Sequence, residues 1–162
     1  MGMVAELKKI SSDNLQKLLD DPSGLEDVLF EDNDGSNSYN LDKAWHAIHF
    51  MLNGSVQGVS TISGELIVGG KPISEEDMGY GPARYFEVSK VSDISAELET
   101  ITNEAFFENF DAMLNQGDEI YPGFQNTDED KEYIASYFSG LKEFCKKTAQ
   151  ENKCLISYMA WA

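Results

Sequence analysis

Two histidines, the only ones in the chain, lie three residues apart in the stretch from Asn40 to Gly54. In a helix, Asp42, His46 and His49 would fall on successive turns of one face. Asp42 could then orient one imidazole for acid–base catalysis. The same trio could bind a metal ion, but only with a further ligand that the sequence does not name, so no metal site is assigned. Packing of both imidazoles within the core is the alternative.

A second group of residues could bind an anion. Arg84 is the only arginine among 12 basic residues, and it follows the turn Gly79-Tyr80-Gly81-Pro82. A guanidinium group binds carboxylate or phosphate through two parallel hydrogen bonds, which a lysine cannot do. Arg84 and Tyr80 are therefore candidate ligand-binding residues, and a salt bridge from Arg84 to one of the 29 acids is the alternative.

Tyr121, followed by Pro122 and Phe124, is a third candidate, as a ligand-binding residue that lines a pocket. The alternative is that this segment fixes a loop over the core. The standard phosphate-loop, dinucleotide-binding, calcium-loop and nucleophile-elbow motifs are each incomplete in this chain. We therefore assign no catalytic residue beyond the candidates His46, His49 and Asp42, and we expect no cofactor.

The stretch 40–54 is predicted to be a helix because its apolar residues recur at helical spacing. Asn40 is suited to cap its first turn, and Gly54 is suited to end it because glycine tolerates positive φ. The apolar stripe consists of Leu41, Ala44, Trp45, Ile48, Met51 and Leu52.

The rest of the chain reads as a mixture of strands and helices. Strands are expected at 3–10, 65–68, 84–88 and 154–161. Helices are expected at 11–20, 22–29, 74–77, 89–101 and 102–114, and a longer one begins at Thr127. Residues 31–38 are expected to form a polar loop. This order predicts one α+β domain over residues 1–162, with helices packed on a small mixed or antiparallel sheet as a single layer pair.

Composition narrows the class of partner. The hydrophobic fraction of 41% is that of a folded globular protein, and the formal net charge is −17. Such a charge repels phosphate, so nucleic acid is not expected as a partner, whereas a basic protein would be attracted. We expect no membrane association and a cytoplasmic location, because there is no signal peptide, no membrane-spanning run and only two cysteines.

Several motifs occur together in one order: Met1-Gly2-Met3, the run Leu41–His46 with His49, Gly69-Gly70, Gly79–Tyr85 and Ile120-Tyr121-Pro122. This combination resembles the YfbM-like family, small bacterial proteins grouped as a domain of unknown function. The resemblance covers nearly the whole chain. It implies a single α+β domain in a bacterial cytoplasm and no established activity.

These observations predict a non-catalytic binding or interaction protein, with a basic protein as its expected partner. The alternative is a small enzyme or a binder of an anionic small molecule. His46 or His49 would then act in acid–base chemistry, Asp42 would orient the imidazole, and Arg84 with Tyr80 would hold the anion. That alternative requires an imidazole and Arg84 to line one cleft.

Overall fold

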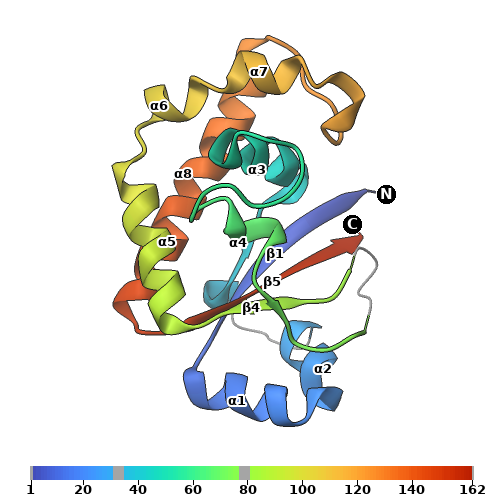
Figure 1. Cartoon of the computed structure of the whole chain (residues 1–162), viewed down its shortest axis with the longest axis vertical. Coiled ribbons are helices and arrows are strands. Elements are labelled where there is room, and N and C mark those ends of the chain that lie inside the picture. The colour runs from blue at the N-terminus through green and yellow to red at the C-terminus, as the bar shows by residue number, and fades with distance from the viewer. Residues whose placement is uncertain (1, 31–34, 77–80, 162) are drawn as a thin grey trace.

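An antiparallel sheet forms the centre of the computed structural model, which describes residues 2–30, 35–76 and 81–161. In this part of the chain the sheet has five strands in the order β2-β1-β5-β4-β3, and every pair is antiparallel. The central strands are β1 (Met3–Ile10) and β5 (Cys154–Trp161) (Figure 1). They pair along their whole length, from Met3 opposite Trp161 to Ile10 opposite Cys154. The outer strands are β2 (Ser38–Asn40), β4 (Arg84–Phe86) and β3 (Lys71–Pro72).

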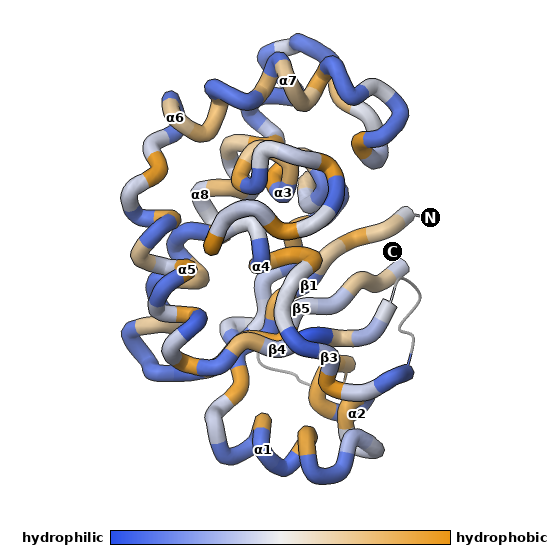
Figure 2. Tube along the Cα trace, in the orientation of Figure 1, coloured by the Kyte–Doolittle hydropathy of each residue, from blue (hydrophilic) through white to orange (hydrophobic). Residues whose placement is uncertain are grey.

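Most helices cover one face of this sheet (Figures 1 and 2). Their apolar residues form the main core with one face of β1, β4 and β5, including Leu7, Phe86 and Leu155. The long helix α8 packs beside α5, and three acids in its first turn favour the positive end of its dipole. The helices of this layer are α3 (Trp45–Asn53), α4 (Glu65–Val68), α5 (Val88–Thr100), α6 (Asn103–Phe107), α7 (Phe110–Leu114) and α8 (Asp128–Gln150).

The helices α1 (Ser12–Asp20) and α2 (Leu25–Phe30) lie against the opposite face of the sheet (Figure 1). They bury a second cluster that includes Ile10 and Ile156. Both cysteines are free and buried, Cys145 in the main cluster and Cys154 in the second. Short 3-10 turns link these elements: η1 (Pro22–Gly24), η2 (Gly35–Asn37), η3 (Asp42–Ala44) and η4 (Gly117–Glu119).

The predicted α+β class and the antiparallel option for the sheet are confirmed. Both terminal strands have the predicted bounds. Several helix starts are also confirmed, because Ser11, Thr102 and Thr127 each accept a hydrogen bond from the third residue after them.

The strand predicted at 65–68 is wrong, because these residues form the single helical turn α4. Leu66 and Ile67 are neighbours in sequence and both belong to the main core cluster, whereas neighbours in a strand point to opposite faces of the sheet. Tertiary packing has therefore overridden the β-branched composition. The helix expected at 74–77 is absent over residues 74–76, and Asp77 lies outside the described residues. The strand expected at 84–88 ends at Phe86, because α5 begins at Val88.

Candidate functional site

The helix that carries both histidines begins later than the sequence suggests. Asp42 has φ +49°, which is not a right-handed helical conformation, so the helical turns of η3 and α3 do not extend back to Asn40. The Asn40 side chain still accepts a hydrogen bond from the Asp42 amide at 2.6 Å. Gly54 ends α3 with φ +80°, which confirms it as the left-handed cap. Asp42 therefore does not continue the regular helical turns that carry the two imidazoles.

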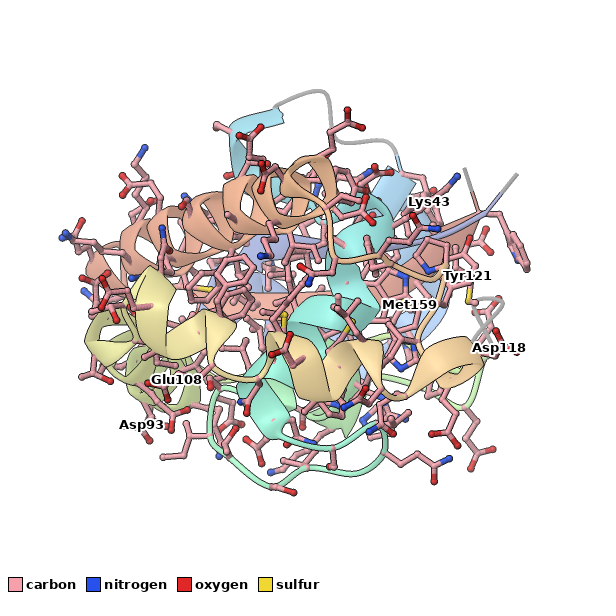
Figure 3. All side chains as sticks on the ribbon, turned by 90° about the horizontal axis from the view of Figure 1, so that it is seen from above. Lys43, Asp93, Glu108, Asp118, Tyr121 and Met159 are labelled. Atoms are coloured by element: carbon pink, nitrogen blue, oxygen red, sulfur yellow. The ribbon has the colours of Figure 1, made fainter. Side chains whose placement is uncertain are left out.

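His46 belongs to a cluster that joins α3 to the start of β1. Its Nδ1 accepts a hydrogen bond from the backbone amide of Tyr121 at 2.9 Å. Its ring stacks on the Trp45 ring, with 4.7 Å between the ring centroids. The Tyr121 hydroxyl accepts from the Met3 amide at 2.9 Å, and the Trp45 indole donates to the Met3 carbonyl at 3.3 Å. We call Met3, Trp45, His46 and Tyr121 the N-terminal niche (Figure 3 labels Tyr121).

The protonation state of His46 follows from these contacts. Burial lowers the pKa of His46 below its usual 6.5, so the neutral ring predominates at pH 7. Because Nδ1 accepts from Tyr121, the neutral ring must carry its proton on Nε2. His46 can therefore donate a hydrogen bond through Nε2, but it lacks a carboxylate orienter.

Asp42 is held by a tyrosine instead. Its Oδ2 accepts from the Tyr133 hydroxyl at 2.6 Å, and the same hydroxyl accepts from the Lys43 amide at 3.2 Å. Burial, followed by the contact with Asp42, raises the pKa of Tyr133. The hydrogen bonds of the described residues include none between Asp42 and either imidazole, so the proposed orienting role has no geometric support. A long-range partner such as Tyr133 leaves no signal in the local sequence.

His49 lies inside the core, with 1% of its surface exposed. Neither ring nitrogen makes a hydrogen bond of acceptable geometry to a described residue. Burial and the neighbouring His46 lower the pKa of His49 to about 4, and the nearby backbone of Gly58 and Gly64 opposes this only in part. The ring is thus neutral at pH 7 and cut off from solvent.

Arg84 lies half-buried on β4, in a crevice of about 100 Å³ that it shares with Pro82, Ser157 and Met159. Its Nη1 is 3.5 Å from the Gly70 carbonyl oxygen, and within the described ranges no carboxylate forms an ion pair with it. The crevice contains neither histidine. Tyr80, its expected companion, lies outside the described residues.

The sheet register fixes how far Arg84 lies from the N-terminal niche. Arg84 is opposite Ser157, and Met3 is opposite Trp161, so all four positions share the face that α3 covers. Ser157 and Trp161 are four residues apart on β5, about 13 Å along the strand. The fold therefore brings His46 and Tyr121 together, leaves Arg84 apart from them and buries His49 in the core.

Residues 2–30, 35–76 and 81–161 contain neither a cluster of metal-ligating side chains nor a membrane-spanning helix. No three His, Cys, Asp or Glu side chains in these ranges are grouped as metal ligands would be. None of the helices there is long and apolar enough to cross a membrane.

The antiparallel sheet, with a large helical layer on one face and a small one on the other, defines a class of α+β protein. Within that class, residues 1–158 match the sequence model of a family described as Domain of unknown function (DUF1877), and the chain belongs to this family. No curated protein matches the chain.

A solved structure shows the same fold. The protein of unknown function YfbM from Escherichia coli is similar over 97% of this chain and 99% of its own, with a TM-score of 0.73 and 18% sequence identity. The resemblance inferred from the motifs is thereby confirmed at the level of family and fold. At this identity the similarity says nothing of a shared ligand or partner.

Proposed function

We propose that this chain is a non-catalytic binding protein that docks a basic partner through an acidic face. The catalytic alternative required an imidazole and Arg84 in one cleft. His46 accepts a hydrogen bond from the Tyr121 amide, His49 is buried, and neither imidazole lines the Arg84 crevice. The candidate groups therefore favour a structural role over a shared catalytic one.

The acidic face consists of α6, α7, η4 and the first turns of α8, which lie together at one end of the molecule (Figure 1). Residues 103–132 contain nine acids and one lysine, a net charge of −8 out of −17 for the whole chain. The acids are Glu104, Glu108, Asp111, Asp118, Glu119, Asp128, Glu129, Asp130 and Glu132.

The single observation that supports the proposal is that these nine carboxylates stay uncompensated. Eight are exposed and Asp130 is half-buried. None forms an ion pair with another described residue, because the ion pairs found there use Glu65, Glu143 and Glu151. Such a field attracts and steers a cationic surface. Figure 3 looks onto this end, with Glu108 and Asp118 towards its two sides.

The first test compares two triple variants of equal charge. Glu108→Lys, Asp118→Lys and Glu132→Lys reverse the acidic face, whereas Asp13→Lys, Glu26→Lys and Glu75→Lys reverse three exposed acids elsewhere. Binding to a lysine-rich probe peptide is measured by calorimetry at 50 and 300 mM NaCl. We expect the face variant to weaken binding about tenfold at low salt and the control variant to weaken it less than threefold.

Equal losses in the two variants would show that only total charge matters, and this would refute the proposed docking face. Circular dichroism is used to check that both variants are folded. A partner captured from lysate counts in favour only if the face variant fails to bind it and the control variant retains it.

A further inference from the structure

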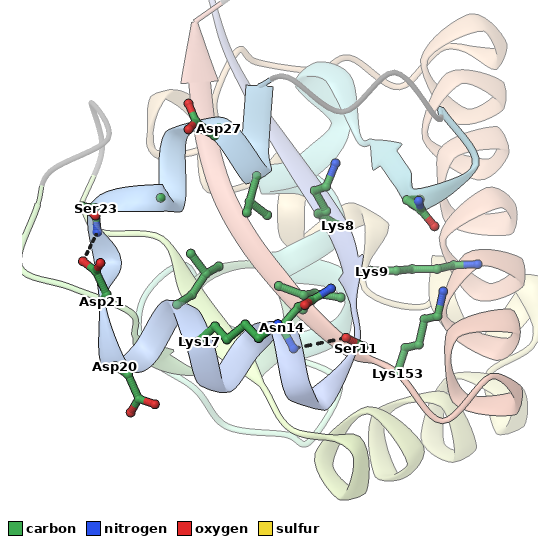
Figure 4. Close-up of a pocket in the computed structure, with 15 residues that line it drawn as sticks. Lys8, Lys9, Ser11, Asn14, Lys17, Asp20, Asp21, Ser23, Asp27 and Lys153 are labelled. Atoms are coloured by element: carbon green, nitrogen blue, oxygen red, sulfur yellow. Dashed lines mark hydrogen bonds between the residues drawn. The ribbon is translucent and has the colours of Figure 1, made fainter.

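A cavity lies far from the acidic face, between α1, η1 and the last residues of β1 (Figure 4). Its volume is about 830 Å³, which is within the range of small-molecule sites. Four lysines line it, namely Lys8, Lys9, Lys17 and Lys153, together with Ser11 and Asn14, and Figure 4 places Lys9, Lys153 and Ser11 at one end. Four of the 12 basic residues therefore line one cavity in a chain of net charge −17.

The lysines of this cavity are incompletely neutralised. Lys9 is 9% exposed and contacts Glu151 at 2.8 Å, and Lys153 contacts the other oxygen of Glu151 at 3.6 Å. One carboxylate thus serves two ammonium groups. Lys17 is exposed and has no ion pair with a described residue, while Lys8 already has an interaction within the fold. The excess positive charge comes from Lys17 and from the pair Lys9 and Lys153, which share the single negative charge of Glu151.

Polar groups at the same end can complete the coordination of an anion. Ser11 lies at the start of α1, and its Oγ accepts the Asn14 amide at 3.2 Å, which leaves its hydroxyl hydrogen available. Figure 4 shows Asn14 and Lys17 on α1 and Lys9 and Lys153 on the far side of Ser11. The α1 dipole adds positive potential at Ser11.

The other end of the cavity is acidic and limits what can bind. Asp20, Asp21 and Asp27 lie on the side of the cavity away from Lys9 and Lys153 (Figure 4), and Asp21 accepts a hydrogen bond from the Ser23 amide at 3.2 Å. A ligand with anionic groups at both ends would meet repulsion there. The cavity therefore favours a molecule with its anionic group at one end.

We propose that this cavity binds a small molecule through a terminal carboxylate or phosphate group held by Lys17, Lys153, Ser11 and Asn14. This inference is independent of the acidic docking face, because it uses a different end of the molecule and ligands of opposite charge. Either proposal can fail while the other stands.

The test titrates the full-length ¹⁵N-labelled protein with two probes, inorganic phosphate and acetate, at constant ionic strength. Sodium chloride in place of the probe reports the salt effect. We expect saturable amide shifts in residues 8–17 and 153 with at least one probe, and the comparison shows whether phosphate or carboxylate is preferred. Absence of saturable shifts in these residues up to 50 mM of either probe would overturn the proposal.

Two pairs of variants make the test specific. Lys17→Gln should weaken binding about fivefold, whereas Lys146→Gln, another exposed lysine, should change it less than twofold. Glu151→Gln should strengthen binding severalfold by releasing Lys9 and Lys153, whereas Glu143→Gln makes the same change in net charge away from the cavity. Equal effects within either pair would mean non-specific attraction and would also overturn the proposal.

Discussion

At the scale of single residues, the two histidines have opposite roles in the structure. His46 accepts from the Tyr121 amide and stacks on Trp45, so it holds a loop to the start of α3. His49 is buried beneath the segment 55–64. The buried side chain of Asn53 holds this segment in place by donating hydrogen bonds to the carbonyls of Ser55 and Gly58. An uncharged but unpaired imidazole in the core is costly to protonate.

The buried state of His49 predicts a loss of stability in acid. Its pKa is about 4 in the folded protein and 6.5 in the unfolded chain, so between these values the unfolded chain binds more protons. The free energy of unfolding should therefore fall as pH falls from about 6.5 to about 4, by up to roughly 3 kcal/mol from this residue. Urea unfolding at pH 7, 5.5 and 4.5 measures this fall in the free energy of unfolding.

The matched variant for this prediction is His49→Leu, which keeps an apolar side chain of similar size and cannot titrate. Both proteins share their carboxylates and His46, so the difference between their pH profiles isolates His49. We expect the wild-type curve to fall more steeply below pH 6.5. Parallel profiles would mean that His49 can protonate in the folded state.

At the scale of elements, the contact between β2 and α8 closes one edge of the sheet. Tyr39 donates to the Tyr137 carbonyl at 2.9 Å and stacks on Phe144 at 5.7 Å. Burial raises the pKa of Tyr39 to about 12. Tyr39 can lie there because Gly140 has no side chain, since an added Cβ would overlap the Tyr39 ring and hydroxyl.

Gly140→Ala should therefore destabilise the protein, although alanine in place of glycine normally stabilises a helix by about 1 kcal/mol. Displacement of Tyr39 costs its hydrogen bond and ring packing, and we expect a net loss of roughly 1–3 kcal/mol. Denaturant unfolding measures the change. Ser139→Ala, at the exposed neighbouring position of α8, is the control and should change stability by less than about 0.5 kcal/mol.

If Gly140→Ala were instead as stable as the wild type or more so, β2 would not be seated on α8 as described. An intact Tyr39 contact in that variant would be equally contradictory.

At the scale of the whole molecule, charge is distributed unevenly between the two ends. The acidic face carries nine of the 29 acids, and the cavity beside α1 is lined by four of the 12 basic residues. Self-repulsion within the acidic face opposes folding, and salt screens it over about 10 Å at 0.1 M ionic strength.

The melting temperature should consequently rise by several degrees between 10 and 300 mM NaCl. The face variant Glu108→Lys, Asp118→Lys and Glu132→Lys changes the net charge from −17 to −11, and it should show a smaller rise. Scanning calorimetry gives both values. A wild-type melting temperature that falls with salt would mean that attractive ion pairs outweigh the repulsion.

The sequence determined the elements whose signals are local. The bounds of β1 and β5, the caps at Ser11, Gly54, Thr102 and Thr127, and the α+β class all follow from apolar spacing and backbone preference within a few residues. The YfbM-like resemblance followed from motifs in one order, and the family is confirmed.

Only the tertiary structure decided which residues meet. Asp42 contacts Tyr133 rather than His46, Glu65–Val68 forms a helical turn because both of its central residues are buried, and lysines from β1, α1 and the turn before β5 line one cavity. The residues brought together are far apart in the sequence: Lys8 and Lys153, which line the same cavity, are separated by 145 positions. Spacing along the chain cannot specify them, because such pairs are set by how the sheet and helices pack.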